Sequence, residues 1–490
     1  MTERVLQFGE GNFLRAFIDA FIQELNIKGL FDGKVVVVQP IALGLADKLN
    51  EQKGRYNVLL RGLENGEPRV RSLAVDCISR AINPYTSFSE YMKTIENPQL
   101  RYIVSNTTEA GIAFNEGDKP DDKPPSSFPA KVTALLYERF KLFNGDNDKG
   151  FIFIPCELID DNGSKLKEIV LKYAQVWQLP DDFVDWINTA NYFTNTLVDR
   201  IVTGYPTDEI EVLEKEMGYK DDLLVAGEIF HFFAIEADEK TRAIIDSDLP
   251  FVKAGFNVVL TDNAAPYKLR KVRILNGAHT MSVLAAFLTG IDTVCEMIGD
   301  KNYSDFLEHG MYKEIIPTLL EGSGLGADEL NSFADSVIDR FKNPHIKHYL
   351  LSIALNSVSK FKVRVLPTIL EYVKIKNALP PLLTFSFASL LAFYKGNMVG
   401  EKYIGDRTGE EYEIKDDAAI LSFMNEQWQA MAQYRHDLEI LVRDVCANDM
   451  LWGQDLNNIS GFCMEVTQHL SQILDKGITP ALLSVLGKHL

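Results

Sequence analysis

Apolar and polar positions in the first half of the chain alternate between short and long segments. Four short apolar runs that end in polar residues are predicted strands: residues 5–8, 35–39, 102–105 and 151–154. Longer stretches with helical spacing separate them, such as residues 12–26. This alternation is typical of a parallel sheet with crossover helices. Residues 115–130 contain four prolines among acidic and serine residues and are predicted to form a surface loop.

The pattern changes at about residue 270, where apolar residues recur every three or four positions. Three predicted helices show this spacing: residues 274–288, 327–341 and 420–446. The most apolar stretch, residues 382–394, is shorter than the roughly 20 residues that a transmembrane helix needs. We therefore expect a buried helix there and a mainly α-helical second domain.

Composition and charge narrow the class of protein. A chain of 490 residues is longer than one hydrophobic core usually supports, which favours two domains. A net charge of -19 repels nucleic acids and anionic membranes, and no basic run offsets it, so neither partner is expected. Five scattered cysteines and the lack of a signal-peptide pattern indicate a cytoplasmic protein. Nothing in the pattern specifies an oligomeric state.

A glycine turn follows the first predicted strand. Gly9 and Gly11 lack side chains, so the backbone could approach a pyrophosphate at the start of the next helix. Leu14 stands where the full dinucleotide fingerprint has a third glycine, and a tight turn without a ligand is the alternative. The second strand ends in Gln39 rather than in the carboxylate that holds the adenosine ribose, so the pattern leaves NAD and NADP open.

The most informative segment contains Lys271, Asn276 and His279. On an α-helix these residues share one face, with Asn276 about 140° and His279 about 80° around from Lys271. Reduction of a carbonyl needs a proton donor and a dipole that stabilises the developing alkoxide, which a lysine and an asparagine supply. An amphipathic helix with a solvated basic end is the alternative. Asn195 offers a second amide in another polar segment.

Two other motifs carry weaker signals. His345 and His348 are three residues apart, but no third ligand accompanies them and Lys347 would repel a cation, so no metal is expected. Cys156 and Glu157 end a predicted strand and could border a cofactor. A buried structural cysteine is the favoured interpretation.

Several segments together resemble the long-chain polyol dehydrogenase family, also called the mannitol dehydrogenase family. They are residues 8–17, 107–111, 155–158, 162–163, 195–200 and 271–279. The resemblance implies an α/β Rossmann-type parallel-sheet domain that binds NAD, expected at residues 1–250. It also implies a mainly helical substrate-binding and catalytic domain, expected at residues 251–490, and catalysis without a metal.

The same resemblance implies roles for individual residues. Lys271 would be the general acid in reduction and the base in oxidation, and Asn195 and Asn276 would hold the reacting oxygen. His279 would bind the substrate, and Lys360 would contact a carboxylate or hydroxyl. The cofactor-binding residues implied are Phe8, Gly9, Gly11, Asn12, Phe13, Thr107 and Glu109.

Departures from the family pattern concern the substrate. Lys268 occupies a position that is acidic in some members, and Ser352 falls where polyol-specific members have an arginine. Altered polyol recognition favours a small sugar acid as the substrate. A non-catalytic NAD-binding sensor is the alternative of a different class, but such a protein would not need Lys271.

Overall fold

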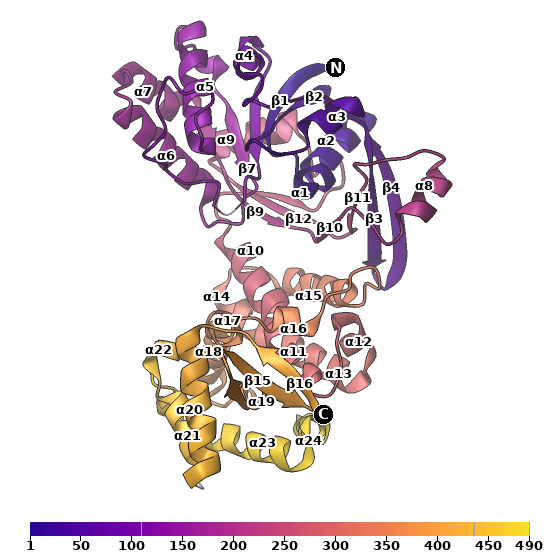
Figure 1. Cartoon of the computed structure of the whole chain (residues 1–490), viewed down its shortest axis with the longest axis vertical. Coiled ribbons are helices and arrows are strands. Elements are labelled where there is room, and N and C mark those ends of the chain that lie inside the picture. The colour runs from indigo at the N-terminus through magenta and orange to yellow at the C-terminus, as the bar shows by residue number, and fades with distance from the viewer. Residues whose placement is uncertain (109, 435–436, 490) are drawn as a thin grey trace. The chain divides into compact units, whose positions relative to one another are not determined.

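The computed structural model describes residues 1–108, 110–434 and 437–489. It divides into two compact units, Met1–Tyr267 and Lys268–Leu490 (Figure 1). Strand β13 (Val258–Thr261) lies beyond the boundary expected at residue 250 but belongs to the first unit. It does so because it pairs in parallel with β12 (Phe232–Glu236).

A six-stranded parallel sheet organises the first unit, in the order β5-β2-β1-β6-β7-β8. Its strands are β1 (Thr2–Phe8), β2 (Gly33–Val38), β5 (Ile78–Ile82), β6 (Tyr102–Ser105), β7 (Ile152–Pro155) and β8 (Tyr192–Phe193). All of its strand pairs are parallel. The expected Rossmann-type sheet is therefore confirmed, and four of its strands match the four predicted apolar runs to within one residue at their carboxyl ends.

Both faces of this sheet are buried because side chains alternate along each strand. In β2, Val35 and Val37 join one core cluster, whereas Val36 and Val38 join the other. Full burial of one such side chain contributes about 1.5–3 kcal/mol to folding. Continuous apolar runs, rather than alternating ones, are the consequence in the sequence.

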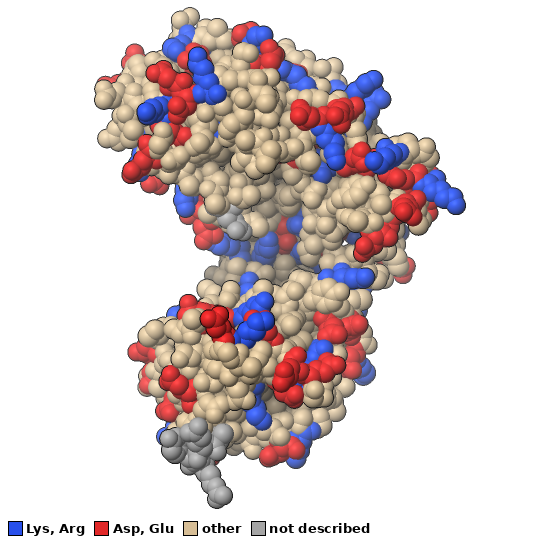
Figure 2. All heavy atoms as spheres, in the orientation of Figure 1, with Lys and Arg blue, Asp and Glu red and all other residues tan. Residues whose placement is uncertain are grey.

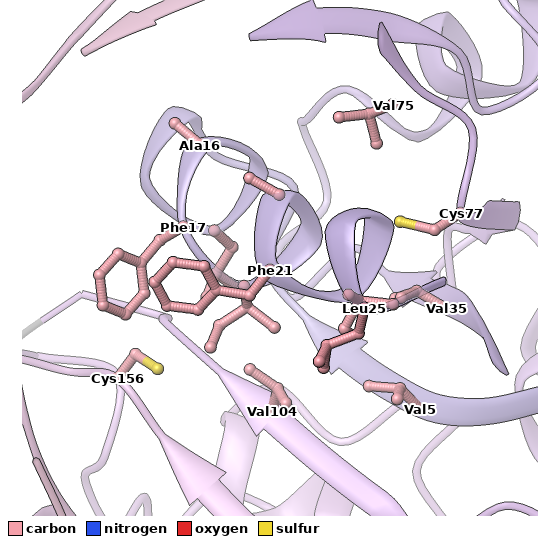
Figure 3. Close-up of a cluster of buried hydrophobic side chains, with 14 of the residues drawn as sticks. Val5, Ala16, Phe17, Phe21, Leu25, Val35, Val75, Cys77, Val104 and Cys156 are labelled. Atoms are coloured by element: carbon pink, nitrogen blue, oxygen red, sulfur yellow. The ribbon is translucent and has the colours of Figure 1, made fainter. Parts of the chain in front are cut away.

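Helices supply the apolar surfaces that cover the sheet. Figure 3 shows Phe21 and Leu25 over Val104 and Val5 in the first cluster. Among the helices on the two faces are α2 (Ile18–Ile27), α3 (Ala46–Glu51), α4 (Phe88–Lys93), α5 (Phe128–Leu142), α6 (Asn162–Val176), α7 (Asp181–Ala190) and α9 (Glu239–Asp248).

The helix predicted at residues 12–26 is broken into α1 (Asn12–Ala16) and α2. The break falls at Phe17, which has φ -122° and ψ -81°. Side chains take the carbonyls that a continuous helix would use: Arg200 Nη1 donates to the Ala16 oxygen at 2.6 Å, and Tyr56 donates to the Arg15 oxygen at 3.0 Å. The helical periodicity of the segment gives no sign of these distant donors.

The predicted loop at 115–130 ends earlier than expected. Helix α5 begins at Phe128, so the last residues of the predicted loop are helical. Pro129 lies in the first turn, where a backbone N–H has no helical partner and a proline is tolerated. Ser127 caps this helix by accepting a hydrogen bond from the Ala130 N–H at 3.3 Å.

Two further sheets complete the first unit. One has the order β10-β11-β3-β4, and the other has the order β13-β12-β9. Their remaining strands are β3 (Tyr56–Glu64), β4 (Glu67–Val75), β9 (Asn195–Asp199), β10 (Val202–Gly204) and β11 (Val225–Glu228), and α8 (Ile210–Met217) follows β10. Antiparallel pairing of β9 with β12 sets Asn195 opposite Glu236.

The second unit is mainly helical, as expected. Its helices include η3 (Lys271–Asn276), α11 (Gly277–Phe287), α12 (Val294–Gly299), α13 (Lys301–His309), η4 (Gly310–Ile315), α14 (Ile316–Gly322), α15 (Ala327–Phe341), α16 (Leu350–Ile353), α17 (Ser357–Arg364), α18 (Leu366–Lys376), α19 (Pro381–Phe393), α22 (Asp449–Trp452), α23 (Phe462–Lys476) and α24 (Ile478–His489). Not predicted was a small antiparallel sheet of β14 (Gly396–Val399), β15 (Lys402–Arg407) and β16 (Glu410–Ile414).

Two buried helices form the centre of the second unit. Every residue of α11 is buried, as is every residue of α19 after Pro381. The buried helix expected at residues 382–394 is therefore confirmed. No helix among the described residues has both the length and the apolar character needed to cross a membrane.

The predicted helix at 420–446 is divided. Helix α20 (Ala418–Tyr434) and helix α21 (Leu438–Cys446) cover it, and residues 435–436 lie outside the described part of the chain.

Helix α2 carries a buried carboxyl group, that of Asp19. One oxygen, Oδ2, accepts hydrogen bonds from Tyr56 at 3.0 Å and from Gln7 at 3.3 Å. The other has no hydrogen-bond partner among the described residues. Burial raises the pKa of Asp19 from 3.8 to about 7, because the charged form is deprived of water.

We predict that Asp19→Asn removes a pH-dependent loss of stability. The raised pKa means that Asp19 favours folding below about pH 4 and that this contribution is lost as pH rises through 7. Over this range the loss is about 4 kcal/mol. Urea unfolding from pH 5 to 8 should show the variant gaining stability over the wild type toward pH 8. Asp121→Asn, at an exposed loop position, is the matched control and should track the wild type.

Candidate functional site

The glycine turn lies where the strand order of the parallel sheet reverses. β1 has β2 on one side and β6 on the other, and ligands of such sheets bind at the carboxyl ends of the strands there. Gly9 follows β1 with φ +121°, a conformation that L side chains rarely adopt. A Cβ on Gly9 would lie 2.9 Å from the Asn106 carbonyl oxygen, which follows β6. Gly9 therefore lets the two strand ends approach each other.

Gly11 differs from Gly9 because the fold does not require a glycine there. Its φ is -68°, and a Cβ would meet nothing within 4 Å. Gly11 precedes α1 and offers open space next to the backbone. A bare backbone with room beside it fits the close approach of a pyrophosphate.

Phe8, Asn12 and Phe13, the other expected cofactor residues around the turn, each contact neighbouring residues of the first unit. The Phe8 ring is buried against Tyr91 and Phe128, and the Phe8 carbonyl oxygen accepts from the Asn106 N–H at 3.0 Å. Phe13 stacks on Phe17 at 4.9 Å, and Asn12 Oδ1 accepts from Arg15 Nη2 at 2.6 Å.

Thr107 is fixed by Glu157 at the ends of β6 and β7. Both the N–H and the hydroxyl of Thr107 donate to Glu157 Oε1 at 3.0 Å, and Ser105 donates to Oε2 at 3.0 Å. Burial raises the pKa of Glu157. The neighbouring Cys156 is buried, as the structural interpretation predicted. Glu109 lies outside the described residues.

The side chain of Gln39 forms hydrogen bonds with the backbone of the loop that follows it. Its Nε2 donates to the Ile41 oxygen at 2.8 Å and its Oε1 accepts from the Ala46 N–H at 3.1 Å. Sequence reasoning missed Glu10, whose carboxyl group lies in the same place: a Cβ on Gly44 would be 2.0 Å from Glu10 Oε1 and 2.6 Å from Gln39 Cδ. A carboxyl group next to the end of β2 disfavours a 2′-phosphate there.

Asn195 is held from two sides at the start of β9. Its Oδ1 accepts from the Ser164 N–H at 2.9 Å, and its Nδ2 donates to Glu236 Oε1 at 3.1 Å. The second oxygen of Glu236 accepts from the Ala264 N–H at 2.7 Å. Sequence reasoning missed Glu236, because only the β9–β12 register brings it to Asn195.

The helix with Lys271 is not α-helical throughout. After α10 (Ala265–Arg270), residues Lys271–Asn276 form a π-helical turn, in which backbone hydrogen bonds join residues five apart. The angle of about 140° expected between Lys271 and Asn276 assumed an α-helix and is wrong. The wider turn brings these two residues closer to one face, and such turns are frequent at functional sites. Both side chains are partly exposed, whereas α11 is buried from its first residue.

His279 is a buried imidazole one turn further along. It stacks on Phe341 at 4.2 Å and packs edge-on against His348 at 5.2 Å. Burial and then the neighbouring His348 and Arg340 hold its pKa well below 6.5, so the ring is neutral at physiological pH. Its Nε2 is buried and has no hydrogen-bond partner among the described residues.

Lys360 lies close enough to His279 to lower its pKa, together with Arg364. Lys360 Nζ donates to the Ile353 oxygen at 2.8 Å, and Arg364 Nη1 donates to Thr280 Oγ1 at 3.4 Å. The structure thus places Lys360, Arg364 and His348 near His279. Within the described residues, no cluster of three or more His, Cys, Asp or Glu side chains could hold a metal ion.

Two family models cover most of the chain. The mannitol dehydrogenase Rossmann domain matches residues 3–246, and the mannitol dehydrogenase C-terminal domain matches residues 263–474. The chain belongs to the mannitol dehydrogenase family. It is also 46% identical to the altronate oxidoreductases of Shigella flexneri and Escherichia coli O139:H28, over 98% of this chain and 96% of each relative.

Solved structures of the family share the fold. A D-sorbitol dehydrogenase in substrate-free form aligns with a TM-score of 0.78 at 23% identity, covering 98% of this chain and 95% of that one. The Pseudomonas fluorescens mannitol 2-dehydrogenase complex with NAD and D-mannitol aligns with a TM-score of 0.63 at 20% identity, covering 100% and 95%. As a member of this family, the chain is an NAD-dependent oxidoreductase that acts on CH–OH groups.

We predict that Gly11→Ala weakens NADH binding without unfolding the protein. The added methyl group enters open space in the fold but blocks the backbone from the pyrophosphate. A loss of affinity of about tenfold or more is expected, equivalent to 1.4 kcal/mol or more. Fluorescence titration with NADH measures it, and thermal unfolding should show an unchanged Tm.

Gly299→Ala is the matched control, because a Cβ there also meets nothing within 4 Å, at the end of α12 in the second unit. It should leave both NADH affinity and Tm unchanged. Equal NADH affinity in the two variants would contradict a cofactor role for Gly11.

Proposed function

We propose that this protein reduces D-tagaturonate to D-altronate with NADH, and catalyses the reverse oxidation, in hexuronate breakdown. The observation that carries the proposal is the 46% identity to altronate oxidoreductases over 98% of the chain. The polar groups of the second unit support the chemistry. Lys271 and Asn276 lie on one π-helical turn, and the neutral His279 follows one turn later.

We assign the cofactor to the first unit. The turn from Gly9 to Gly11 fits a pyrophosphate, and Glu10 favours NAD over its 2′-phosphorylated relative. When bound, NADH supplies the hydride that reduces the ketone.

The second unit supplies the proton chemistry in this proposal. Lys271 Nζ donates a proton to the alkoxide that develops as the carbonyl accepts a hydride, and in oxidation it removes that proton. Asn276 donates a hydrogen bond to the same oxygen and stabilises its charge. The same task is proposed for the Asn195 amide, which Glu236 orients. His279 Nε2 binds a substrate hydroxyl.

Related enzymes with the same chemistry are the nearest alternatives: a fructuronate reductase or mannonate dehydrogenase, and a mannitol dehydrogenase. A non-catalytic NAD-binding sensor is the alternative of another class, and Lys271 beside Asn276 argues against it. A cytoplasmic location is part of the proposal, since all five cysteines are free thiols.

The decisive experiment measures NADH consumption with tagaturonate, fructuronate, fructose and fructose phosphate. We expect the highest kcat/KM with tagaturonate. A higher value with fructose would identify a polyol dehydrogenase instead. NADH binding without turnover of any of these substrates would favour the sensor.

Lys271→Ala is predicted to lose turnover by about 10² to 10⁴-fold, the usual contribution of a general acid or base. NADH affinity should remain, because the proposed cofactor turn is in the other unit. The pH dependence of altronate oxidation should lose the ionisation that a deprotonated lysine requires. Stopped-flow kinetics and NADH titration separate the two effects.

Lys301→Ala removes an exposed lysine from α13 and serves as the control with unchanged turnover. Asn276→Ala should slow turnover and keep the pH dependence, since Asn276 carries no proton. A folded Lys271→Ala enzyme with near-normal turnover and the same pH profile would refute the mechanism. Loss of cofactor affinity alone would assign Lys271 to binding.

A further inference from the structure

Two cations of the second unit, Lys360 and Arg364, lie close enough to His279 to lower its pKa. The whole chain carries a net charge of -19, and Figure 2 shows acidic and basic side chains interspersed over the face in view. Many of the basic side chains form ion pairs, for example Arg270 with Glu329 at 2.9 Å and Arg407 with Asp292 at 2.7 Å. A protein of this charge needs a local cationic group to attract an anionic substrate.

Arg364 is such a group. None of the described carboxylates forms an ion pair with it, and its Nη1 donates a hydrogen bond to Thr280 Oγ1. Burial lowers the pKa of Arg364, and no acidic neighbour opposes this shift. A half-buried guanidinium with unused donors is a costly arrangement unless an anion completes it.

Lys360 lies on the same face of α17 as Arg364, because the two are four residues apart. Burial, followed by the charge of Arg364, lowers the pKa of Lys360, whereas Asp416 raises it. Like charges at this spacing destabilise a helix by about 0.2–0.5 kcal/mol. Both charges lie near His279, which favours binding of an anion, rather than helix stability, as the reason for the pair.

The position of Arg364 matches the length of a ketouronate. Its guanidinium reaches Thr280, which is four residues after Asn276 and hence about 6 Å further along the helix axis. In a ketouronate derived from a ketohexose the ketone is at the second carbon and the carboxylate at the sixth. Four C–C bonds separate these carbons, which corresponds to about 5 Å in an extended chain.

We propose that Arg364 binds the carboxylate of the sugar-acid substrate and so selects ketouronates over neutral ketoses. This inference rests on the proposed function. Arg364 offers a planar fork of N–H donors that matches a carboxylate. Lys360 was the residue implied by family resemblance, but its ammonium group lacks this fork, and one of its three donors is held by the Ile353 oxygen. Its role is to add positive potential beside Arg364.

The test compares D-tagaturonate with D-tagatose, the neutral ketose of the same configuration. Arg364→Gln should raise KM for tagaturonate by about 10 to 100-fold, the value of a charged hydrogen bond of about 1.5–3 kcal/mol. The kcat/KM for tagatose should change by less than about twofold. Arg364→Lys should recover part of the loss, because it restores charge without the fork.

Lys362→Gln is the matched control. Lys362 lies on the same helix but about 200° around from Arg364, and its side chain approaches Gly453 instead. The Lys362→Gln substitution removes one positive charge from α17, as Arg364→Gln does, and should leave KM and kcat/KM unchanged for both substrates. Calorimetry of D-altronate binding to each variant provides a readout that does not depend on turnover, and thermal unfolding verifies the fold.

The outcomes separate this inference from the proposed function. If the wild type turns over tagaturonate and Arg364→Gln lowers kcat/KM equally for tagaturonate and tagatose, Arg364 is not the carboxylate ligand. Unchanged KM and unchanged altronate affinity in Arg364→Gln would overturn the inference as well. If the wild type prefers tagatose and does not bind altronate, the proposed function itself fails.

Discussion

Complete burial of helix α11 constrains the chemistry of the second unit. All eleven residues from Gly277 to Phe287 are buried, and this helix continues directly from the π-helical turn that ends in Asn276. Lys271 and Asn276, at the two ends of that turn, are partly exposed. In the proposed mechanism, Lys271 and Asn276 therefore act from a turn that the buried helix holds in place.

The same core is fixed at its other buried helix by a single carboxyl group. Glu314 accepts hydrogen bonds from the N–H groups of Leu382 and Leu383 at 2.8 and 2.9 Å, at the start of α19. These N–H groups have no partner within the helix and are buried away from water. Burial raises the pKa of Glu314 to about 8, which shows the cost of placing it there. A sequence of apolar residues alone cannot hold such a helix end in the core.

Sequence patterns predicted the elements that depend on residues close together in the chain. The parallel strands and the buried helix at 382–394 follow from apolar runs, and Gly9 follows from a turn that needs φ of +121°. What escaped prediction depends on distant partners. Arg200 ends helix α1, and Glu236 reaches Asn195 only through strand register. The π-helical turn was missed because apolar spacing of three and four does not reveal one extra residue.

In the candidate site, too, the sequence indicated the residues but not their distant partners. The spacing placed Lys271, Asn276 and His279 on one helical face and the family resemblance implied their roles, but neither shows which neighbours surround them. His279 is neutral because burial and His348 disfavour its charged form. Arg364 and Lys362 are both cations and lie two residues apart in the sequence, but the fold directs Arg364 to Thr280 and Lys362 to Gly453. The proposed selection of an anionic substrate thus depends less on how many cations the protein has than on where the fold places them.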